Sequence, residues 1–524
     1  MTSLETFLFD DLRRIVSNVG RAGGLMSPSV YDTAQVLRLY PPSTDTEPAF
    51  EWLLDQQQAD GGWGEPYMPT ARDAPTLAAL LALRKRDHLP RVRESLAAGE
   101  AFLRRRGEYW RPPLPEDIPV GAELVVPALL DAAEKNRISV ARHDFSALEA
   151  LGARRRTIID KRGPTAATPP GDYGEAWGDE PDVRLQDGSG GIGHSPAATA
   201  RWLRMTAGRD ELNRARQRAV DYLISASGAT RVGLPAVVPT TWPINRYEQA
   251  FVLHTLLAAD LLFDPHLVDV VQPQIESLRE ATLPGGLGYS DYFWPDGDDT
   301  AAAAAVLAAA GYREALRALL PFQQQDYFST FPHELQHSIT VTARGAHALD
   351  TLQMDATPWR DFLAGLQQRD GRWSQDKWNG SWLYTTAITL LAFRQEPERA
   401  QLDRCETILC ATQHPDGGWG SILQQSTVVE TAYAVLALYT LRRCGVWSPG
   451  TEQHWLHAHQ YLRRAYAAEN LGSERFWMGK ELYRPYRVDR AFVLCAMLLP
   501  FVLRQRSSVR GEARGASHVE ALAW

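Results

Sequence analysis

The sequence predicts an all-α fold, and three observations support this prediction. Strand signals are sparse, because runs in which β-branched residues alternate with polar ones are few. Apolar stretches of helical length recur instead, as at 76–86, 301–320 and 428–443, and turns rich in Gly, Pro and Asp separate them. The third observation, an internal repeat, indicates that the helices build two related barrels.

The repeat reads QQADGGWG at 57–64 and QHPDGGWG at 413–420, with a weaker copy, QQRDGRW, at 367–373. Each copy follows one apolar helix and precedes another. Gly gives the turn its backbone freedom, Gln can tie helix ends by hydrogen bonds, and Trp packs over the turn. Repeated helix hairpins of this kind bury one another's faces in a barrel or solenoid. We therefore interpret the repeats as structural staples and assign them no catalysis.

Composition and charge exclude several classes of protein. The 524 residues carry 55 Lys+Arg against 63 Asp+Glu, a net charge of −8 without a long basic run, which argues against nucleic acid as a partner. The four cysteines lack metal-ligand spacing and fit a reducing, cytoplasmic setting. No signal peptide is evident at the N-terminus. The longest apolar stretch, 491–503, contains Pro500 and is too short to span a bilayer.

The most informative segment is Asp296-Gly297-Asp298-Asp299-Thr300, which precedes five alanines. Carboxylates this close cannot all ionise cheaply without cations, because like charges raise a pKa. Two chemistries remain open on this evidence: a carboxylate metal site, or a carboxylic acid kept protonated to donate a proton. The segment is also a good helix N-cap, which is a purely structural alternative.

This acidic segment and the repeat together resemble the class II terpene cyclases. The resemblance is strongest to the bacterial diterpene type, which includes copalyl, halimadienyl and drimenyl diphosphate synthases. Further segments match this family in order along the chain: SVYDTA at 29–34, GAELVVP at 121–127, SPAATA at 195–200, GLGYS at 286–290, DKW at 376–378, ETAY at 430–433 and WMGKELYR at 477–484.

The resemblance implies a didomain of two α/α-barrels, called β and γ, with the active cavity between them. We expect the β-type barrel to comprise residues 1–25 and 236–505, and the inserted γ-type barrel residues 26–235. Residues 506–524, rich in Arg, Gly, Ser and Ala, are expected to form a flexible tail. The chain lacks the Asp-Asp-x-x-Asp motif of class I synthases, so the diphosphate should stay intact.

The family's reaction protonates the terminal alkene of a linear prenyl diphosphate. By position, the resemblance implies that Asp298 is the proton donor and that Asp296 and Asp299 polarise and re-protonate it, while Thr300 caps the following helix. Keeping an Asp half-protonated at pH 7 requires its pKa to rise by about three units, or roughly 4 kcal/mol. Burial and an adjacent carboxylate can supply this shift.

The resemblance also assigns the remaining site residues. Aromatic faces stabilise carbocations, and the candidates are Tyr289, Trp294, Trp378 and Trp382. The residues expected to bind the diphosphate are Lys161, Lys377, Lys480 and Arg484. Glu123 matches the acidic residue that binds Mg²⁺ in this family, and Mg²⁺ would bridge it to phosphate oxygens.

The substrate and the end of the reaction stay open. Geranylgeranyl diphosphate (C20), giving a copalyl- or halimadienyl-type product, is the first expectation, and farnesyl diphosphate (C15), giving drimenyl diphosphate, is the alternative. A lower alternative is a non-catalytic prenyl diphosphate carrier, which would not need the triple carboxylate. Plant enzymes carry an Asn where this chain has Ala236, and neither His194 nor the pair His333-Glu334 can be assigned as the terminating base. A class I synthase or a phosphatase is the expected downstream partner.

Overall fold

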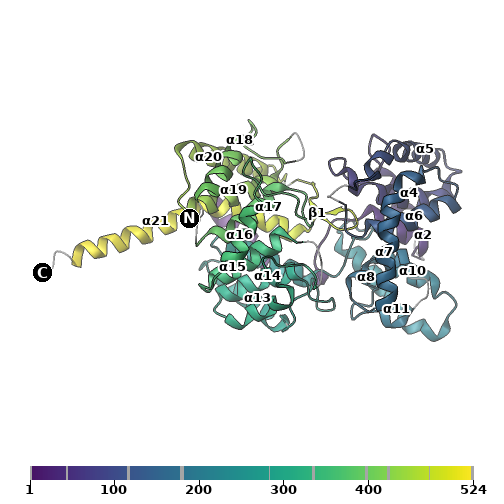
Figure 1. Cartoon of the computed structure of the whole chain (residues 1–524), viewed down its shortest axis with the longest axis horizontal. Helices are drawn as coiled ribbons and strands as arrows, with labels where there is room; N and C mark the ends of the chain where they lie inside the picture. Colours follow the sequence, from purple (N-terminus) through teal and green to yellow (C-terminus); the bar gives the residue numbers. More distant parts are fainter. Residues whose placement is uncertain are drawn as a thin grey trace.

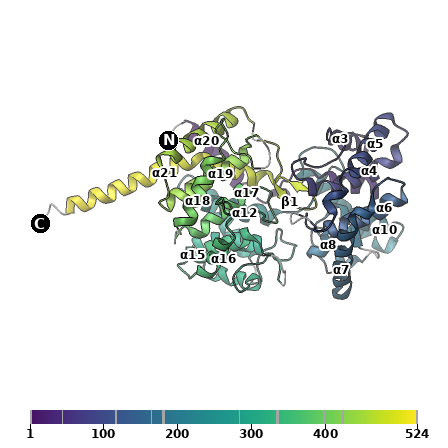
Figure 2. The same ribbon diagram turned by 45° about the horizontal axis from the view of Figure 1, so that its top comes forward.

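In a computed structural model, the described part of the chain folds into two helical bodies that lie side by side (Figures 1 and 2). The structure describes residues 3–42, 45–114, 118–163, 165–177, 182–282, 284–332, 337–395, 399–421, 425–470 and 472–520. We call the bodies the barrel domain, which holds both ends of the chain, and the inserted domain. Their hydrophobic cores divide between Met26 and Val30 and again between Val238 and Ile244. Met26 thus belongs to the core of the barrel domain and 236–238 to that of the inserted domain, whereas the predicted boundaries placed each on the other side.

The α-helices of the barrel domain are α1 (Ser3–Val16), α12 (Asn245–Ala258), α13 (Val268–Ala281), α14 (Gly297–Ala309), α15 (Ile339–Thr351), α16 (Thr357–Gly365), α17 (Trp382–Leu390), α18 (Arg399–Ala411), α19 (Val428–Arg443), α20 (Pro449–Ala467) and α21 (Tyr486–Glu520). Those of the inserted domain are α2 (Val30–Leu39), α3 (Glu47–Asp55), α4 (Asp73–Leu83), α5 (Pro90–Arg104), α6 (Ala122–Lys135), α7 (Ser146–Arg162), α8 (Pro169–Asp172), α9 (Gly174–Trp177), α10 (Pro196–Met205) and α11 (Asn213–Ala229). Short 3-10 helices connect them: η1 (Arg21–Gly23), η2 (Pro69–Ala71), η3 (Arg84–Arg86), η4 (Gly107–Trp110), η5 (Arg142–Phe145), η6 (Val183–Leu185), η7 (Asp210–Leu212), η8 (Arg313–Phe322) and η9 (Leu391–Phe393).

Each domain has an inner ring of helices that closes on itself. In the barrel domain the ring runs α12, α14, α15, α17, α19, α21 and back to α12, and α1, α13, α16, α18 and α20 pack outside it. In the inserted domain the ring runs α2, α4, α6, α9, α10 and back to α2. Inner helices such as α14 and α19 are buried on nearly every face, as expected for helices that are apolar all round. The predicted all-α architecture of two barrels is confirmed.

One predicted helix is shorter in the structure than its apolar stretch. The stretch at 301–320 ends as an α-helix at Ala309, because Gly311 has a φ of 93° and breaks the ladder before η8 begins. The chain after residue 506, predicted as a flexible tail, continues α21 to Glu520, and Figures 1 and 2 show this end standing away from the barrel. In the described residues no helix has the length and apolarity to cross a membrane.

The repeats form the staples that their sequence predicts. The Gln57 side-chain amide donates to the carbonyl of Gly61 (2.8 Å) and to that of Ser95 on the next helix (3.0 Å). The Trp63 indole donates to the carbonyl of Leu53 (2.8 Å), at the end of the preceding helix. The other two copies make the equivalent bonds to backbone carbonyls: Gln367 and Gln413 correspond to Gln57, and Trp373 and Trp419 correspond to Trp63.

A fourth staple escaped the sequence analysis. The Gln186 amide donates to the carbonyls of Gly190 and Ala215, both at 2.8 Å, and Ile192 stands where the other copies have Trp. The backbone N–H of Ile192 donates to the hydroxyl of Thr199 on the next helix. In the other three copies the backbone N–H of the tryptophan likewise donates to a threonine hydroxyl on the next helix. The geometry of the turn is therefore kept where the tryptophan is lost.

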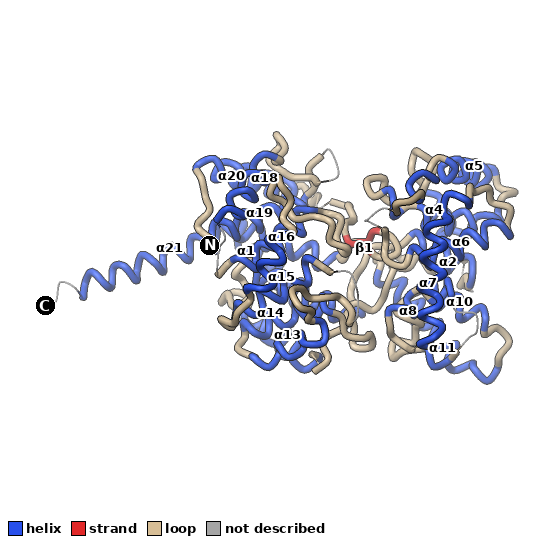
Figure 3. Tube along the Cα trace, viewed as in Figure 1, coloured by secondary structure: helices blue, strands red, loops and turns tan. Residues whose placement is uncertain are grey.

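A short hairpin lies between the two domains. Its strands, β1 (Trp477–Met478) and β2 (Leu482–Tyr483), pair antiparallel with Trp477 opposite Tyr483. Figure 3 shows it in red between the helical bodies.

Candidate active site

The carboxylate motif begins helix α14 inside the barrel domain. Asp296 is the N-cap residue, and its Oδ1 accepts the backbone N–H of Asp299 at 2.9 Å. The structural N-cap interpretation is therefore correct for Asp296. Thr300 does not cap the helix as expected, because its hydroxyl exchanges hydrogen bonds with the backbone of Leu287 instead.

Asp296 and Asp299 are a buried carboxyl pair. Burial and the charge of Asp298 raise the pKa of Asp296 to about 7, although its bond from the Asp299 N–H acts in the opposite direction. Burial, followed by the charges of Asp296 and Asp298, raises the pKa of Asp299 well above its usual range. Asp296 Oδ2 and Asp299 Oδ1 find no hydrogen-bond partner within the described parts of the chain. The pair therefore holds at least one proton near neutral pH.

Asp298 differs from its neighbours in having a cationic partner. Its Oδ1 lies 2.5 Å from Nη1 of Arg344 on α15, and its side chain is 13% exposed. Arg344 is fully buried and also donates to the hydroxyl of Tyr384 on α17. Burial raises the pKa of Asp298 to about 6, while the guanidinium of Arg344 limits the rise. Asp298 can therefore be protonated near neutral pH and yet give up its proton more readily than Asp299.

Aromatic side chains from elements far apart in sequence surround this ion pair. The Arg344 guanidinium lies 4.4 Å from the ring centre of Phe251 on α12. The ring centres of Tyr384 and Trp477 are 4.9 Å apart, and that of Tyr247 is 5.7 Å from Trp477. We call Tyr247, Phe251, Tyr384 and Trp477 the aromatic wall.

Neither Arg344 nor the aromatic wall was predicted from the sequence. Two signals were available. Arg344 is the one arginine in helix ITVTARGAHALDT, where it follows a run of apolar and small residues, and an arginine is rarely buried without a partner. Trp477 stands in the matched segment WMGKELYR, but only its lysine and its arginine were singled out.

The four aromatic residues predicted from sequence lie in different surroundings. Tyr289 stacks on Phe293 with ring centres 4.0 Å apart, next to His194 at the border between the domains. Trp294 is 55% exposed. The Trp378 indole donates to the Thr330 hydroxyl at 3.1 Å. Trp382 opens α17 in the core, with the Arg372 guanidinium 4.9 Å from its ring centre.

The predicted diphosphate cations are also dispersed. Lys161 is exposed on α7, and Lys377 lies with its Nζ 5.2 Å from the ring centre of Trp378. Arg484 forms an ion pair with Asp489 at 3.3 Å.

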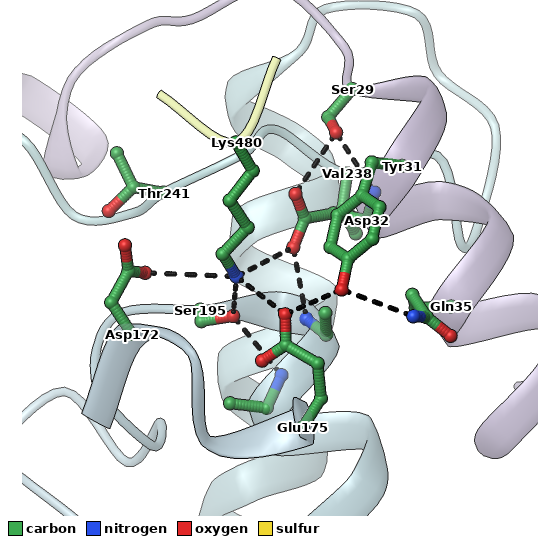
Figure 4. Close-up of polar contacts among 12 residues, drawn as sticks. Ser29, Tyr31, Asp32, Gln35, Asp172, Glu175, Ser195, Val238, Thr241 and Lys480 are labelled. Carbon is green, nitrogen blue, oxygen red and sulfur yellow. Dashed lines mark hydrogen bonds and ion pairs between the residues drawn. The ribbon is translucent and has the colours of Figure 1, made fainter. Parts of the chain in front are cut away.

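Lys480 lies in the turn of the β1–β2 hairpin, buried against the inserted domain (Figure 4). Its Nζ lies 3.0 Å from a carboxyl oxygen of Glu175, 3.6 Å from Asp32 and 3.9 Å from Asp172, and it donates to the hydroxyl of Ser195 at 2.6 Å. Burial raises the pKa of Asp32 to about 6 and that of Asp172 to about 7, although Lys480 opposes both shifts. A lysine among these carboxyls offers no bare positive charge to a diphosphate. The prediction that Lys480 binds the diphosphate therefore disagrees with its surroundings.

Glu123 opens helix α6 and is buried, with Oε1 2.6 Å from Nη1 of Arg155 on α7. No group of three or more His, Cys, Asp or Glu side chains in the described residues has the arrangement of a metal site. This still fits Mg²⁺, since Mg²⁺ in phosphate sites is held by one or two carboxylates together with substrate oxygens.

The candidate terminating bases are not accessible in the structure or lie outside its described residues. His194 is fully buried, with Nδ1 2.9 Å from a carboxyl oxygen of Asp187 and Nε2 2.5 Å from the hydroxyl oxygen of Ser290. His333 and Glu334 lie outside the described residues.

Comparison with known proteins gives a consistent result. The chain is 44% identical over 513 residues to a (+)-kolavenyl diphosphate synthase of Herpetosiphon aurantiacus, covering 95% of this chain and 98% of the relative. It is 31% identical to an ent-copalyl diphosphate synthase of a Streptomyces species, over 90% of this chain and 92% of the relative. The solved ent-copalyl diphosphate synthase of Streptomyces platensis superimposes with a TM-score of 0.76 at 26% identity, covering 94% of this chain and 99% of that one. No protein-family model matches the sequence.

Proposed function

Since the chain belongs to the class II diterpene cyclases, we propose that it converts geranylgeranyl diphosphate into a bicyclic diphosphate of the kolavenyl, copalyl or halimadienyl type. The observation that carries this proposal is the Asp298–Arg344 ion pair, set between a proton-holding carboxyl pair and the aromatic wall. The enzyme is an isomerase, because proton donation and proton loss cancel over one turnover. Farnesyl diphosphate, cyclised by the same chemistry, is the alternative substrate.

Asp298 supplies the proton in this proposal. Arg344 occupies Oδ1, so the transferable proton is assigned to Oδ2. With a pKa of about 6, Asp298 is protonated in about a tenth of the molecules at pH 7. The alkene π electrons take the proton to form a C–H bond, and the O–H electron pair stays on the carboxylate. Arg344 then stabilises this new negative charge through its charge-assisted hydrogen bond.

The cation left on the substrate migrates as successive alkenes close the rings. The aromatic wall offers ring faces and no strong nucleophile, and each face stabilises a nearby cation by about 0.5 to 2 kcal/mol. A base removes a proton at the end, which restores neutrality of the hydrocarbon. We further propose that the Asp296–Asp299 pair returns a proton to Asp298, since the pair retains one near pH 7.

The diphosphate is proposed to bind at the far end of the substrate, against helices α6 and α7. Glu123, at the start of α6, would hold Mg²⁺, which would neutralise phosphate charge when bound. Lys161, exposed on α7, adds positive charge on this side, whereas Arg155 on the same helix is ion-paired with Glu123. Addition of EDTA is therefore expected to raise the KM for the prenyl diphosphate, and Mg²⁺ to restore it.

Two further proposals concern the cell. All four cysteines lie in the described residues as free thiols, which supports a cytoplasmic site of action. Because the product keeps its diphosphate, an enzyme that ionises or hydrolyses a diphosphate ester must consume it.

A product assay tests the function directly. The protein is incubated with Mg²⁺ and either geranylgeranyl or farnesyl diphosphate, and the dephosphorylated alcohols are identified by mass spectrometry. The test variant is Asp298→Asn, and the matched control is Asp361→Asn, which alters an exposed aspartate on α16. A cyclic alcohol from the wild type and the control, absent with Asp298→Asn, is expected. Only linear alcohols from the wild type, with the prenyl diphosphate bound, would favour the carrier alternative.

A further inference from the structure

We infer that Lys480 is a positioning residue that couples the inserted domain to the acid site through the β1–β2 hairpin. The inference rests on the proposed function and gives Lys480 a role other than phosphate binding. Its basis is that the turn of the hairpin is anchored in one domain, while its strands face the other.

The turn is held by the inserted domain at two consecutive residues. Lys480 reaches Asp32 on α2, Asp172 at the end of α8 and Glu175 on α9, as Figure 4 shows. The Glu481 carboxylate accepts the backbone N–H of Val30 at 2.7 Å and that of Tyr31 at 3.3 Å. These N–H groups open helix α2, where a negative charge is favoured. Lys480 in the turn thus pairs with carboxyl groups of the inserted domain, and the neighbouring Glu481 binds the N-terminus of helix α2.

The strands contact the acid site. Trp477 belongs to the aromatic wall, and its indole N–H donates to Asp489 at 3.0 Å. Tyr384, which touches Trp477, accepts a hydrogen bond from Arg344, and Arg344 holds Asp298. Tyr483 faces Trp477 across the hairpin. Burial raises the pKa of Tyr483, a hydrogen bond with Tyr247 lowers it, and the charge of Asp298 raises it further. A contiguous path therefore runs from the Lys480 cluster to the catalytic carboxyl.

The hairpin cannot fix its own position. It has two residues in each strand, and an isolated hairpin is only marginally stable in water. Its backbone is also joined to the barrel domain, since the Gly380 N–H donates to Phe476 and the Met478 N–H to Trp378. With one side tied to the barrel and the turn tied to the inserted domain, Lys480 sets how far Trp477 reaches toward the site.

This role and phosphate binding predict different kinetics. A phosphate ligand contributes binding energy at the head of the substrate, so its loss raises KM and weakens inhibition by inorganic pyrophosphate. A positioning residue shapes the wall around the cation, so its loss lowers kcat and changes the ratio of cyclic products. Product ratio is the readout that a merely structural or phosphate-binding role would not move.

The experiment compares wild type with Lys480→Met and with Lys480→Arg, which keeps the charge but carries a longer, planar head. The control is Lys135→Met, an exposed lysine at the end of α6. If the buried carboxyls left by Lys480→Met prevent folding, the double variant Lys480→Met/Glu175→Gln removes one of them and is used in its place. Products, kcat, KM and pyrophosphate inhibition are measured, with hydrogen exchange of 376–384 and 476–484 as a readout independent of turnover.

We expect both Lys480 variants to yield at least one new cyclic or incompletely cyclised product, with kcat reduced about tenfold or more and pyrophosphate inhibition changed less than about twofold. Hydrogen exchange in the two segments should rise with Lys480→Met and stay unchanged with Lys135→Met. A wild-type product ratio with raised KM and weakened pyrophosphate inhibition would overturn the inference, as would unchanged exchange. Absence of turnover in the wild type would refute the proposed function, while the exchange data would still decide the coupling.

Discussion

Replacing Arg344 by Gln should shift the pH dependence of cyclisation upward. Arg344 forms a charge-assisted hydrogen bond to Asp298 at 2.5 Å, and this bond favours the ionised carboxylate. Removing the positive charge therefore raises the pKa of Asp298. Such a bond contributes about 1.5 to 3 kcal/mol, which corresponds to a shift of about one to two pH units.

The sign of the effect on rate follows from the protonation state. The reaction requires the protonated acid, so kcat should fall as the pH rises through the pKa of Asp298, which is about 6. In Arg344→Gln this alkaline limb should move to about pH 7 to 8, because the acid stays protonated longer. The plateau at low pH should drop about tenfold or more, because the acid is weaker and its conjugate base loses its cationic partner.

Other groups also face Asp298, and they set the control. Burial and the charge of Asp376 raise the pKa of Asp298, and Lys377 lowers it along with Arg344. Tyr384→Phe leaves these charges in place and removes only a neutral partner of Arg344, so it should move the limb by less than about half a unit.

The assay is kcat for the cyclic product at saturating substrate. It is measured from about pH 5 to pH 9, so that the alkaline limbs of the wild type and of Arg344→Gln are both covered. The reasoning is refuted if the alkaline limb of Arg344→Gln stays where the wild type has it or moves to lower pH. An equal shift with Tyr384→Phe would assign the effect to local repacking.

Three predictions concern stability, measured by thermal or urea unfolding. Gly152→Ala should destabilise the protein by about 1 to 3 kcal/mol, because the new methyl group meets the backbone carbonyl of Glu123. The matched control is Gly228→Ala in α11, where the methyl group enters open space; it should stabilise the protein by up to about 1 kcal/mol. Gln413→Ala should cost about 1 to 3 kcal/mol by leaving two half-buried staple bonds unmade, and an unchanged midpoint would mean that the staple is dispensable. Relative to the wild type, Asp172→Asn should be more stable at about pH 8 than at about pH 5. The raised pKa of Asp172 means that folding disfavours its ionised form, so the wild type loses stability as the pH rises and the variant does not. An equal difference between variant and wild type at both pH values would contradict the assignment.

Local features of the site could be predicted from sequence. The acid motif and its N-cap depend on residues within one turn, so Asp296 and Asp298 were located correctly at the start of a buried helix. The staples were likewise readable, because Gln, Gly and Trp recur at fixed spacing.

Long-range features could not be predicted in this way. The aromatic wall joins Tyr247, Tyr384 and Trp477 from α12, α17 and β1, and no spacing in the chain records that these meet. The surroundings of Lys480 depend on how the two domains pack, so the sequence showed a rare lysine and not the carboxyls that neutralise it.

The closed ring of the barrel domain also determines when, during translation, the acid site can be completed. The inserted domain has its complete inner ring once α10 has been made, whereas the barrel ring stays open until α21 packs between α19 and α12. The inserted domain can therefore fold while the rest of the chain is still being synthesised. Helix α1 packs on α21, so it finds this partner only when the end of the chain has been made. Asp298 is translated before Tyr384 and Trp477 of the aromatic wall and before the closing helix α21, so the acid site is complete only when the end of the chain has been made.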